Sequence, residues 1–193
     1  MNITQLQKHR RKQAKLLPTY QGVYVLVDWF NAALYVGASI DSIRKRARRH
    51  LTSARSDLLS NQKMMTEEIA FIWFYPTVDR EHTKMLEQHL IFTHDAHRPL
   101  MNSKVPEEDC ICIVPEKSII QLVPDCELER RRDPAEAYRH HLSMLGKLLE
   151  YVLTTKDNSD TRKALAVRHS LMEYHRAAFV LTRCAAEEDE DDE

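Results

Sequence analysis

The chain has 193 residues, 43% of them apolar and 30% charged, which is enough for one domain with a hydrophobic core plus an appendage. No stretch approaches the roughly 20 apolar residues of a membrane span, and the N-terminus is polar rather than signal-like, so we expect no membrane association and a cytoplasmic protein, nucleoid-associated or nuclear depending on the host. The net charge of −1 hides an asymmetry, because residues 187–193 are all acidic and the rest of the chain holds 28 basic against 22 acidic residues. A basic body with an acidic tail predicts a polyanionic partner for the body.

The first half of the chain predicts helices alternating with strands. In chain order we expect a basic helix (3–17), two strands joined as an antiparallel hairpin (23–27 and 33–36), a helix (41–56), a strand (69–75) and a helix (80–94). Residues 28–31 form the turn of the hairpin, Ser39 or Asp41 caps the helix that follows it, and Asp79 caps the helix after the third strand.

The second half predicts a weaker hairpin (111–114 with 119–123) and then helices. Asp133-Pro134 is a good helix start, and a last helix covers 160–185. The whole is an α+β fold with a mostly helical C-terminal extension. We expect five regions: a basic N-terminal helix (1–17), an α+β module (18–104), a hairpin and linker (105–132), a helical C-terminal region (133–186) and an acidic disordered tail (187–193).

The helix that begins near Ile43 carries two kinds of basic residue. At about 100° per residue its apolar positions form one stripe, and Arg44, Lys45, Arg48 and Arg49 point away from it as a phosphate-seeking ridge. Arg46 and His50, one turn apart, lie at the border of the stripe. A border arginine is well placed to hold a phosphate in a cleft, although on periodicity alone an ordinary surface arginine is the favoured interpretation.

Glu87 is a carboxylate in a mostly apolar part of its helix. Leu86, Leu90 and Ile91 surround it in the sequence, so it should lie close to the core. An ionised carboxylate there needs a compensating cation or hydrogen-bond donor. A buried lysine or arginine would serve, and so would a divalent metal, since one carboxylate with waters and substrate oxygens is an ordinary magnesium environment. Spacing alone leaves both open.

The predicted hairpin carries two tripeptides that relate Arg46, His50 and Glu87 to one another. Gly22-Val23-Tyr24, ten intervening residues and Tyr35-Val36-Gly37 resemble the paired signature of the GIY-YIG nuclease superfamily. Leu17-Pro18 precedes the first signature, and Arg46, His50, Glu87 and Asn102 follow the second in the order typical of that family. The resemblance covers about residues 17–104.

The resemblance implies a small three-stranded sheet flanked by helices, with Tyr24 and Tyr35 beside the scissile phosphate. One tyrosine would activate the attacking water, and by position Tyr35 is favoured. Arg46 would hold a phosphate oxygen, His50 would assist proton transfer, Asn102 would support the site, and Glu87 would bind one Mg²⁺ or Mn²⁺. The predicted function is therefore a metal-dependent DNA endonuclease.

Three features depart from the family pattern. Val23 and Val36 replace isoleucines. The interval from Tyr35 to Arg46 is one residue longer than in many members, so Arg44 or Lys45 is an alternative phosphate contact. Ala38 stands where some relatives carry a lysine, which excludes a lysine base at that point.

Two other functions remain open. The fold is also compatible with a nucleic-acid-binding module that does not cut, and the C-terminal helices with the acidic tail are compatible with a protein-interaction adaptor. The C-terminal helices are in addition a candidate surface for a homodimer or another protein partner. The DNA structure or sequence that would be cut is not specified.

Overall fold

The computed structural model describes residues 3–52, 64–155 and 158–191 of the chain. They divide into two compact units, Met1–Leu128 and Glu129–Glu193, and each is described by itself. The first unit contains the sheet and the second contains only helices.

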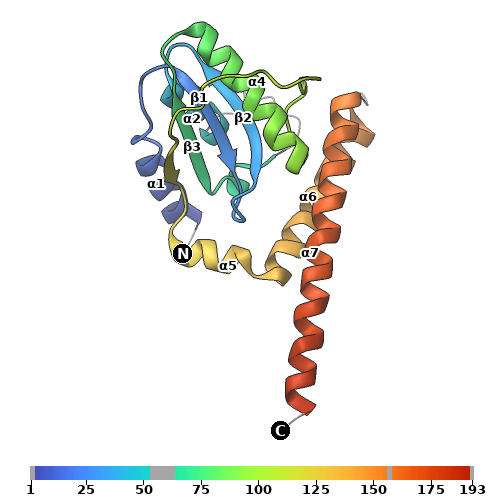
Figure 1. The fold of residues 1–193 in the computed structure, drawn as a ribbon. Helices are drawn as coiled ribbons and strands as arrows, with labels where there is room; N and C mark the ends of the chain where they lie inside the picture. Colours follow the sequence, from blue (N-terminus) through green and yellow to red (C-terminus); the bar gives the residue numbers. More distant parts are fainter. Residues whose placement is uncertain (1–2, 53–63, 156–157, 192–193) are drawn as a thin grey trace. The chain divides into compact units, whose positions relative to one another are not determined.

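The first unit is built from a four-stranded antiparallel sheet with helices on both faces. In chain order it contains α1 (Ile3–Gln13), β1 (Gly22–Val27), β2 (Ala33–Ser39), α2 (Ile43–Thr52), the 3-10 turn η1 (Thr66–Glu68), β3 (Phe71–Pro76), α4 (Arg80–His97), β4 (Ser118–Gln121) and the first half of α5 (Asp125–Arg132), within which the boundary to the second unit falls. The strand order is β2-β1-β3-β4, so β2 and β4 are the edges. Figure 1 shows α4 on one side of the sheet and α2 on the other.

The central strand β1 is buried along its whole length because both faces are covered. Its alternate residues Val23, Val25 and Val27 belong to one hydrophobic core with Leu86 and Leu90 of α4. The residues between them point to the opposite face. On that face α2 packs through its fully buried Ile43 and Ala47.

Local sequence signals are confirmed by the observed turns and caps. The Asp28 carboxylate accepts hydrogen bonds from the Phe30 and Ala32 backbone amides at 2.8 and 2.9 Å, and Asn31 adopts a left-handed φ of 61°, which closes the β1–β2 turn. Asp79 caps α4 by accepting from His82 N at 2.7 Å. The cap of α2, however, is Ser42, whose hydroxyl accepts from Lys45 N, in place of the expected Ser39 or Asp41.

The sheet has four strands, where three are expected. β4 pairs antiparallel with β3, but the predicted partner of β4 (111–114) forms no strand. That segment lies along α4 instead, where the Cys110 thiol donates to the Met85 carbonyl at 2.9 Å and His82 Nε2 lies 2.8 Å from the Ile113 carbonyl. These long-range contacts replace the predicted hairpin.

Several predicted boundaries also shift. The first unit continues to Leu128 rather than ending at 104, because Val123 and Leu128 are part of its core. The expected linker ends in α5, a helix whose acidic first turn and basic last turn suit the helix dipole. Helix α1 ends at Gln13 instead of 17, and α4 continues to His97. The predicted end of the α2 helix (53–56) lies outside the described residues.

The second unit is a helical hairpin of α6 (Pro134–Thr154) and α7 (Ser159–Asp191). Asp133 caps α6 as predicted, accepting from Glu136 N at 3.0 Å. Met144 and Leu148 of α6 are buried, as are Val167 and Leu171 of α7. Residues 187–191, predicted to belong to a disordered acidic tail, continue α7 instead. Residues 192–193 lie outside the described part. Among the described helices, none combines the length and the apolar character that a membrane crossing requires.

Candidate functional site

Two tyrosines of the hairpin lie together over a glycine. Tyr24 of β1 pairs with Gly37 of β2, and Tyr35 stands two residues before Gly37 on the same face. The ring centroids of Tyr24 and Tyr35 are 6.4 Å apart. A Cβ at Gly37 would lie 2.6 Å from the Tyr24 hydroxyl oxygen and 2.8 Å from Tyr35 Cε1. The two phenols can therefore occupy this face only because residue 37 has no side chain.

His50 joins the two tyrosines from α2. Its Nε2 lies 2.9 Å from the Tyr24 hydroxyl, in a hydrogen bond that either atom can donate, and its ring centroid is 5.1 Å from that of Tyr35. His50 is 9% exposed, because it follows the buried Ile43 and Ala47 on the inward side of the helix. The helix periodicity noted in the sequence thus places His50 against the sheet.

Arg46 lies beside the same phenol, one turn before His50. Burial raises the pKa of Tyr24 above its ordinary value of 10.0, and the neighbouring Tyr35 and Glu87 raise it further, while Arg46 lowers it through its charge and a hydrogen bond. Tyr24 has 0% exposure, so it remains a neutral phenol at physiological pH. Arg46 itself is an exposed residue, so its guanidinium stands between the buried phenol and solvent.

The two remaining predicted residues, Asn102 and Glu87, lie at the outer edge of β2. Val36 N donates to Asn102 Oδ1 at 3.0 Å, and Asn102 Nδ2 donates to the Val36 carbonyl at 2.8 Å. Two residues further along the same edge, the Ala38 N–H donates to the Glu87 carboxylate. The Asn102 side-chain amide therefore pairs with both backbone groups of Val36, as a neighbouring strand would. Glu87 is held by the same strand, which also carries Tyr35.

Glu87 is a partly buried carboxylate without a lysine among its recorded partners. Burial raises its pKa above the ordinary 4.5, whereas the Ala38 N–H and the Arg46 charge lower it. Glu87 in turn raises the pKa of Tyr24 through its charge, so the carboxylate at the β2 edge is electrostatically coupled to the phenols. Tyr24, Tyr35, Arg46, His50 and Glu87 thus form one interacting group.

The donor set at Glu87 fits a hydrated magnesium-type ion better than a fully protein-ligated one. Among the described residues there is no group of three or more His, Cys, Asp or Glu side chains that could hold a metal. One carboxylate with open oxygen lone pairs suits a cation that keeps several waters and takes further oxygens from a substrate. A zinc site, with three or four protein ligands, does not fit this arrangement.

The four ridge residues of α2 differ in their surroundings. The Arg44 Nε–H donates to the Leu17 carbonyl at 2.6 Å, so this guanidinium anchors the chain that leads into β1. Lys45, Arg48 and Arg49 are exposed. Arg44 is thus tied to the backbone, whereas Arg46 is the basic residue of this helix that adjoins Tyr24.

Sequence reasoning did not identify the structural reason for Gly37 or the partner of Glu87. The short distance from Gly37 to Tyr24 follows from strand register, which a YxG motif alone does not specify. The Ala38 N–H, a backbone donor, leaves no signal in the sequence at all. Both belong to the site as much as the predicted side chains do.

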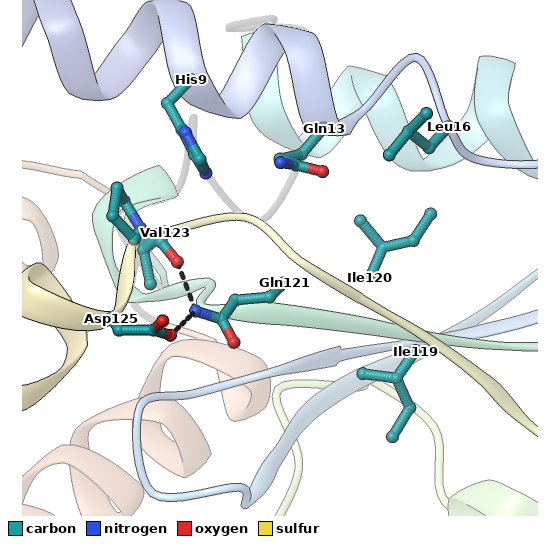
Figure 2. A pocket seen from close by; sticks show the side chains of 9 residues that line it. His9, Gln13, Leu16, Ile119, Ile120, Gln121, Val123 and Asp125 are labelled. Carbon is teal, nitrogen blue, oxygen red and sulfur yellow. Dashed lines mark hydrogen bonds between the residues drawn. The ribbon is translucent and has the colours of Figure 1, made fainter.

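The described cavity lies elsewhere in the first unit. An open groove of about 470 Å³ runs between α1 and the edge strand β4. Figure 2 shows His9 and Gln13 of α1 on one side of it and Ile119 and Gln121 of β4 on the other. None of the predicted site residues lines this groove.

The sequence is similar to part of two longer proteins. It is 30% identical over 111 residues, 58% of its length, to the UvrABC system protein C of Synechococcus sp. (strain CC9605). It is also 30% identical over 102 residues, 53% of its length, to the UvrABC system protein C of Parasynechococcus marenigrum (strain WH8102). The matches cover 16% and 15% of those proteins, so the chain corresponds to about a sixth of their length. No protein-family model matches the sequence.

Proposed function

We propose that the Met1–Leu128 unit is a DNA endonuclease that hydrolyses phosphodiester bonds with the aid of one Mg²⁺ or Mn²⁺ at Glu87. The observation that carries the proposal is the convergence of two phenols, a guanidinium, an imidazole and a carboxylate at the β2 edge of the sheet. The GIY-YIG resemblance predicts this set, and the similarity to the C proteins of two UvrABC systems supports a function connected with DNA.

The two tyrosines take different roles in this proposal. Tyr24 is fully buried, and the raised pKa of its phenol keeps its proton in place, so it positions His50 rather than acting as a base. Tyr35 is partly exposed and stands next to the His50 ring. We therefore assign the activation of the attacking water to Tyr35, with His50 taking up or ordering the proton.

Charge develops on the phosphoryl oxygens and on the leaving 3′ oxygen as the water oxygen bonds to phosphorus and the P–O3′ bond breaks. Arg46 offsets the charge on a non-bridging oxygen, as an aimed cation in a partly desolvated site can. A divalent cation, when bound at Glu87, supplies Lewis-acid stabilisation of the leaving oxygen. Asn102 contributes by holding β2 in register.

The proposal is tested by nicking of supercoiled plasmid DNA with Mg²⁺ or Mn²⁺, comparing the wild type with Glu87→Gln. Glutamine keeps an oxygen for the Ala38 N–H but removes the charge that would bind the cation, so nicking should fall to background while the fold is retained. Equal nicking by both proteins, or none by the wild type with either metal, would favour the non-cleaving binding module or the adaptor. A panel of duplex, single-stranded, flap and branched DNAs then identifies the substrate structure.

A second proposal concerns the helical unit, which we infer forms a homodimer through α6. Leu142, Leu149 and Leu153 are exposed at the spacing of a helix–helix seam, and Gly146 lies between them with no atom near its Cβ position. A second copy packed there would bring two nuclease units to one DNA. Light scattering should give a dimer mass for the wild type and a monomer mass for Leu149→Glu; a monomeric wild type would contradict the dimer.

A further inference from the structure

Helix α1 has three distinct sides. Leu6, Arg10 and Ala14 are buried against the body of the unit, and His9 and Gln13 face the groove beside β4 (Figure 2). At about 100° per residue, the remaining side of the helix and of the turn just after it carries, beside exposed Thr and Gln residues, four exposed cations. These are Lys8, Arg11, Lys12 and Lys15, defined here as the α1 stripe.

Arg10 interrupts the basic run in the sequence but is not part of the stripe. Its guanidinium is buried and donates to the backbone carbonyls of Thr66, Glu67 and Ile69, at 3.0 and 2.9 Å for the last two. These hydrogen bonds fix α1 to η1. The stripe is therefore held at a set position on the unit and is not a loose basic arm.

The α1 stripe has no anionic partner within the described residues. None of the four cations makes a recorded ion pair, and helix α1 itself contains no acidic residue. The imbalance extends along the chain, since residues 1–52 hold ten Lys or Arg and two Asp or Glu, whereas residues 53–128 hold seven and thirteen. Positive charge is thus concentrated in the segment that contains α1 and α2.

The segment that follows α1 is hydrogen-bonded to the start of α2. The carbonyls of Leu17 and Pro18, just after α1, accept from the Nε and backbone N of Arg44 at 2.6 and 2.9 Å. The Tyr20 carbonyl accepts from Ile43 N at 3.0 Å. The segment that follows α1 is therefore tied by backbone and side-chain hydrogen bonds to the start of α2, the helix that carries Arg46.

We propose that the α1 stripe is a second phosphate-binding site, which holds the backbone of duplex DNA flanking the scissile phosphate. The choice of DNA rests on the proposed function. A duplex is favoured over a single strand because single-strand sites add aromatic side chains for stacking, and α1 has no Phe, Tyr or Trp. From Lys8 to Lys15 the stripe is about 10 Å long at about 1.5 Å per residue, which matches roughly three phosphates of one strand at about 3.4 Å spacing.

Binding of a fluorescent duplex in EDTA, measured across KCl concentrations, tests the stripe without cleavage. The variant Lys8→Gln/Arg11→Gln/Lys12→Gln/Lys15→Gln retains good helix formers. Because each lost phosphate contact changes the slope of log K against log salt by about 0.9, its slope should be shallower by about 2–4. Its affinity near 0.1 M salt should fall at least ~10-fold.

Two further variants serve as controls. Lys8→Arg/Lys12→Arg/Lys15→Arg keeps the charge and should keep the wild-type slope and affinity. Arg80→Gln/Lys84→Gln removes two exposed cations that lie on α4, outside the α1 stripe, and should also leave the slope unchanged. Far-ultraviolet circular dichroism and thermal melts verify that every variant is folded.

The possible results separate this inference from the proposed function. A glutamine variant that is folded and binds with wild-type slope and affinity overturns the α1 site, even if the wild type nicks DNA. A wild type that never nicks, combined with a variant that loses duplex affinity, overturns the nuclease and retains the α1 site.

Discussion

The tight packing around Gly37 predicts that Gly37→Ala damages both the fold and the site. The new Cβ would meet the Tyr24 ring and hydroxyl at 2.6 Å and Tyr35 at 2.8 Å, against the roughly 3.5–4.0 Å of ordinary carbon contacts. The Tyr24 ring must move by close to an ångström. It is fully buried and its hydroxyl is tied to His50, so it has no space into which to move without cost.

The expected loss of stability can be worked out from these contacts. Overpacking of a core costs about 1–3 kcal/mol, and the Tyr24–His50 hydrogen bond contributes about 0.5–1.5 kcal/mol. Replacing a strand glycine by alanine returns about 0.5–1 kcal/mol of backbone entropy. The net cost is about 2 kcal/mol, which lowers the Tm by roughly 4–8 °C in a chain of this length. If the unit cuts DNA, a displacement of about 1 Å should slow nicking by up to ~10²-fold.

The matched control is Gly146→Ala, which adds the same methyl group in the middle of α6, where no atom of the chain lies within 4 Å. Because Gly146 also lies in the proposed α6 seam, light scattering must give this variant the same mass as the wild type before their melting temperatures are compared. An alanine in a helix interior is favoured over glycine by about 1 kcal/mol, so this variant should melt at or slightly above the wild-type temperature. Thermal unfolding followed by circular dichroism compares the two. A Gly37→Ala protein as stable and as active as the wild type would refute the packing argument.

Three further predictions concern the β2 edge and the arginines. Burial raises the pKa of Glu87, so the folded state holds this proton more tightly than the unfolded state, and ionisation of Glu87 weakens folding as pH rises from about 4.5 through the raised pKa. Glu87→Gln should therefore equal or exceed the wild type in stability at pH 7 and lose that advantage near pH 4. The variant should also lack any Mg²⁺-induced rise in Tm that the wild type shows. Asn102→Asp replaces the donor to the Val36 carbonyl with an acceptor, which should cost about 2–4 kcal/mol in chemical denaturation because a buried pair is broken; wild-type stability would contradict the edge role. Arg46→Gln should abolish nicking with little change in Tm, whereas Arg44→Gln should lower the Tm and retain slower nicking, and the reverse pattern would exchange their roles.

Much of the fold follows from signals that are local in the sequence. The β1–β2 hairpin, the Asp79 and Asp133 caps and the helical faces of α2 each depend on residues within one or two turns of one another. Such interactions are readable because spacing determines which side chains meet. The order of the α+β elements was predictable for this reason. Periodicity placed Arg46 and His50 together at the border of the apolar stripe, whereas in the fold His50 is buried and Arg46 is exposed.

The errors arise where distant segments compete. Residues 111–114 have the composition of a strand, yet Ile113 among them and Cys110 just before them hydrogen-bond to α4, 31 and 25 positions away. Arg10 reads as one more surface cation, yet carbonyls more than 50 positions away bury it. Neither contact has a periodic signal, so burial of these residues could be learned only from the assembled fold.

Glu87 and Asn102 have a structural role at the edge of β2 that is independent of any catalytic role. An edge strand presents unpaired N–H and C=O groups that must be covered. Met101 N donates to the Leu34 carbonyl at 2.9 Å, Asn102 pairs with both polar groups of Val36, and Glu87 takes the Ala38 N–H. Consecutive outward positions of β2 are thus satisfied by the segments that follow β3. A carboxylate that accepts one hydrogen bond from the backbone still has free lone pairs. The hydrogen bond that covers the edge of β2 therefore also holds Glu87 close enough to affect the pKa of Tyr24. Glutamine satisfies the backbone donor equally well but cannot hold a divalent cation, and this difference separates the structural role of Glu87 from the proposed chemical one.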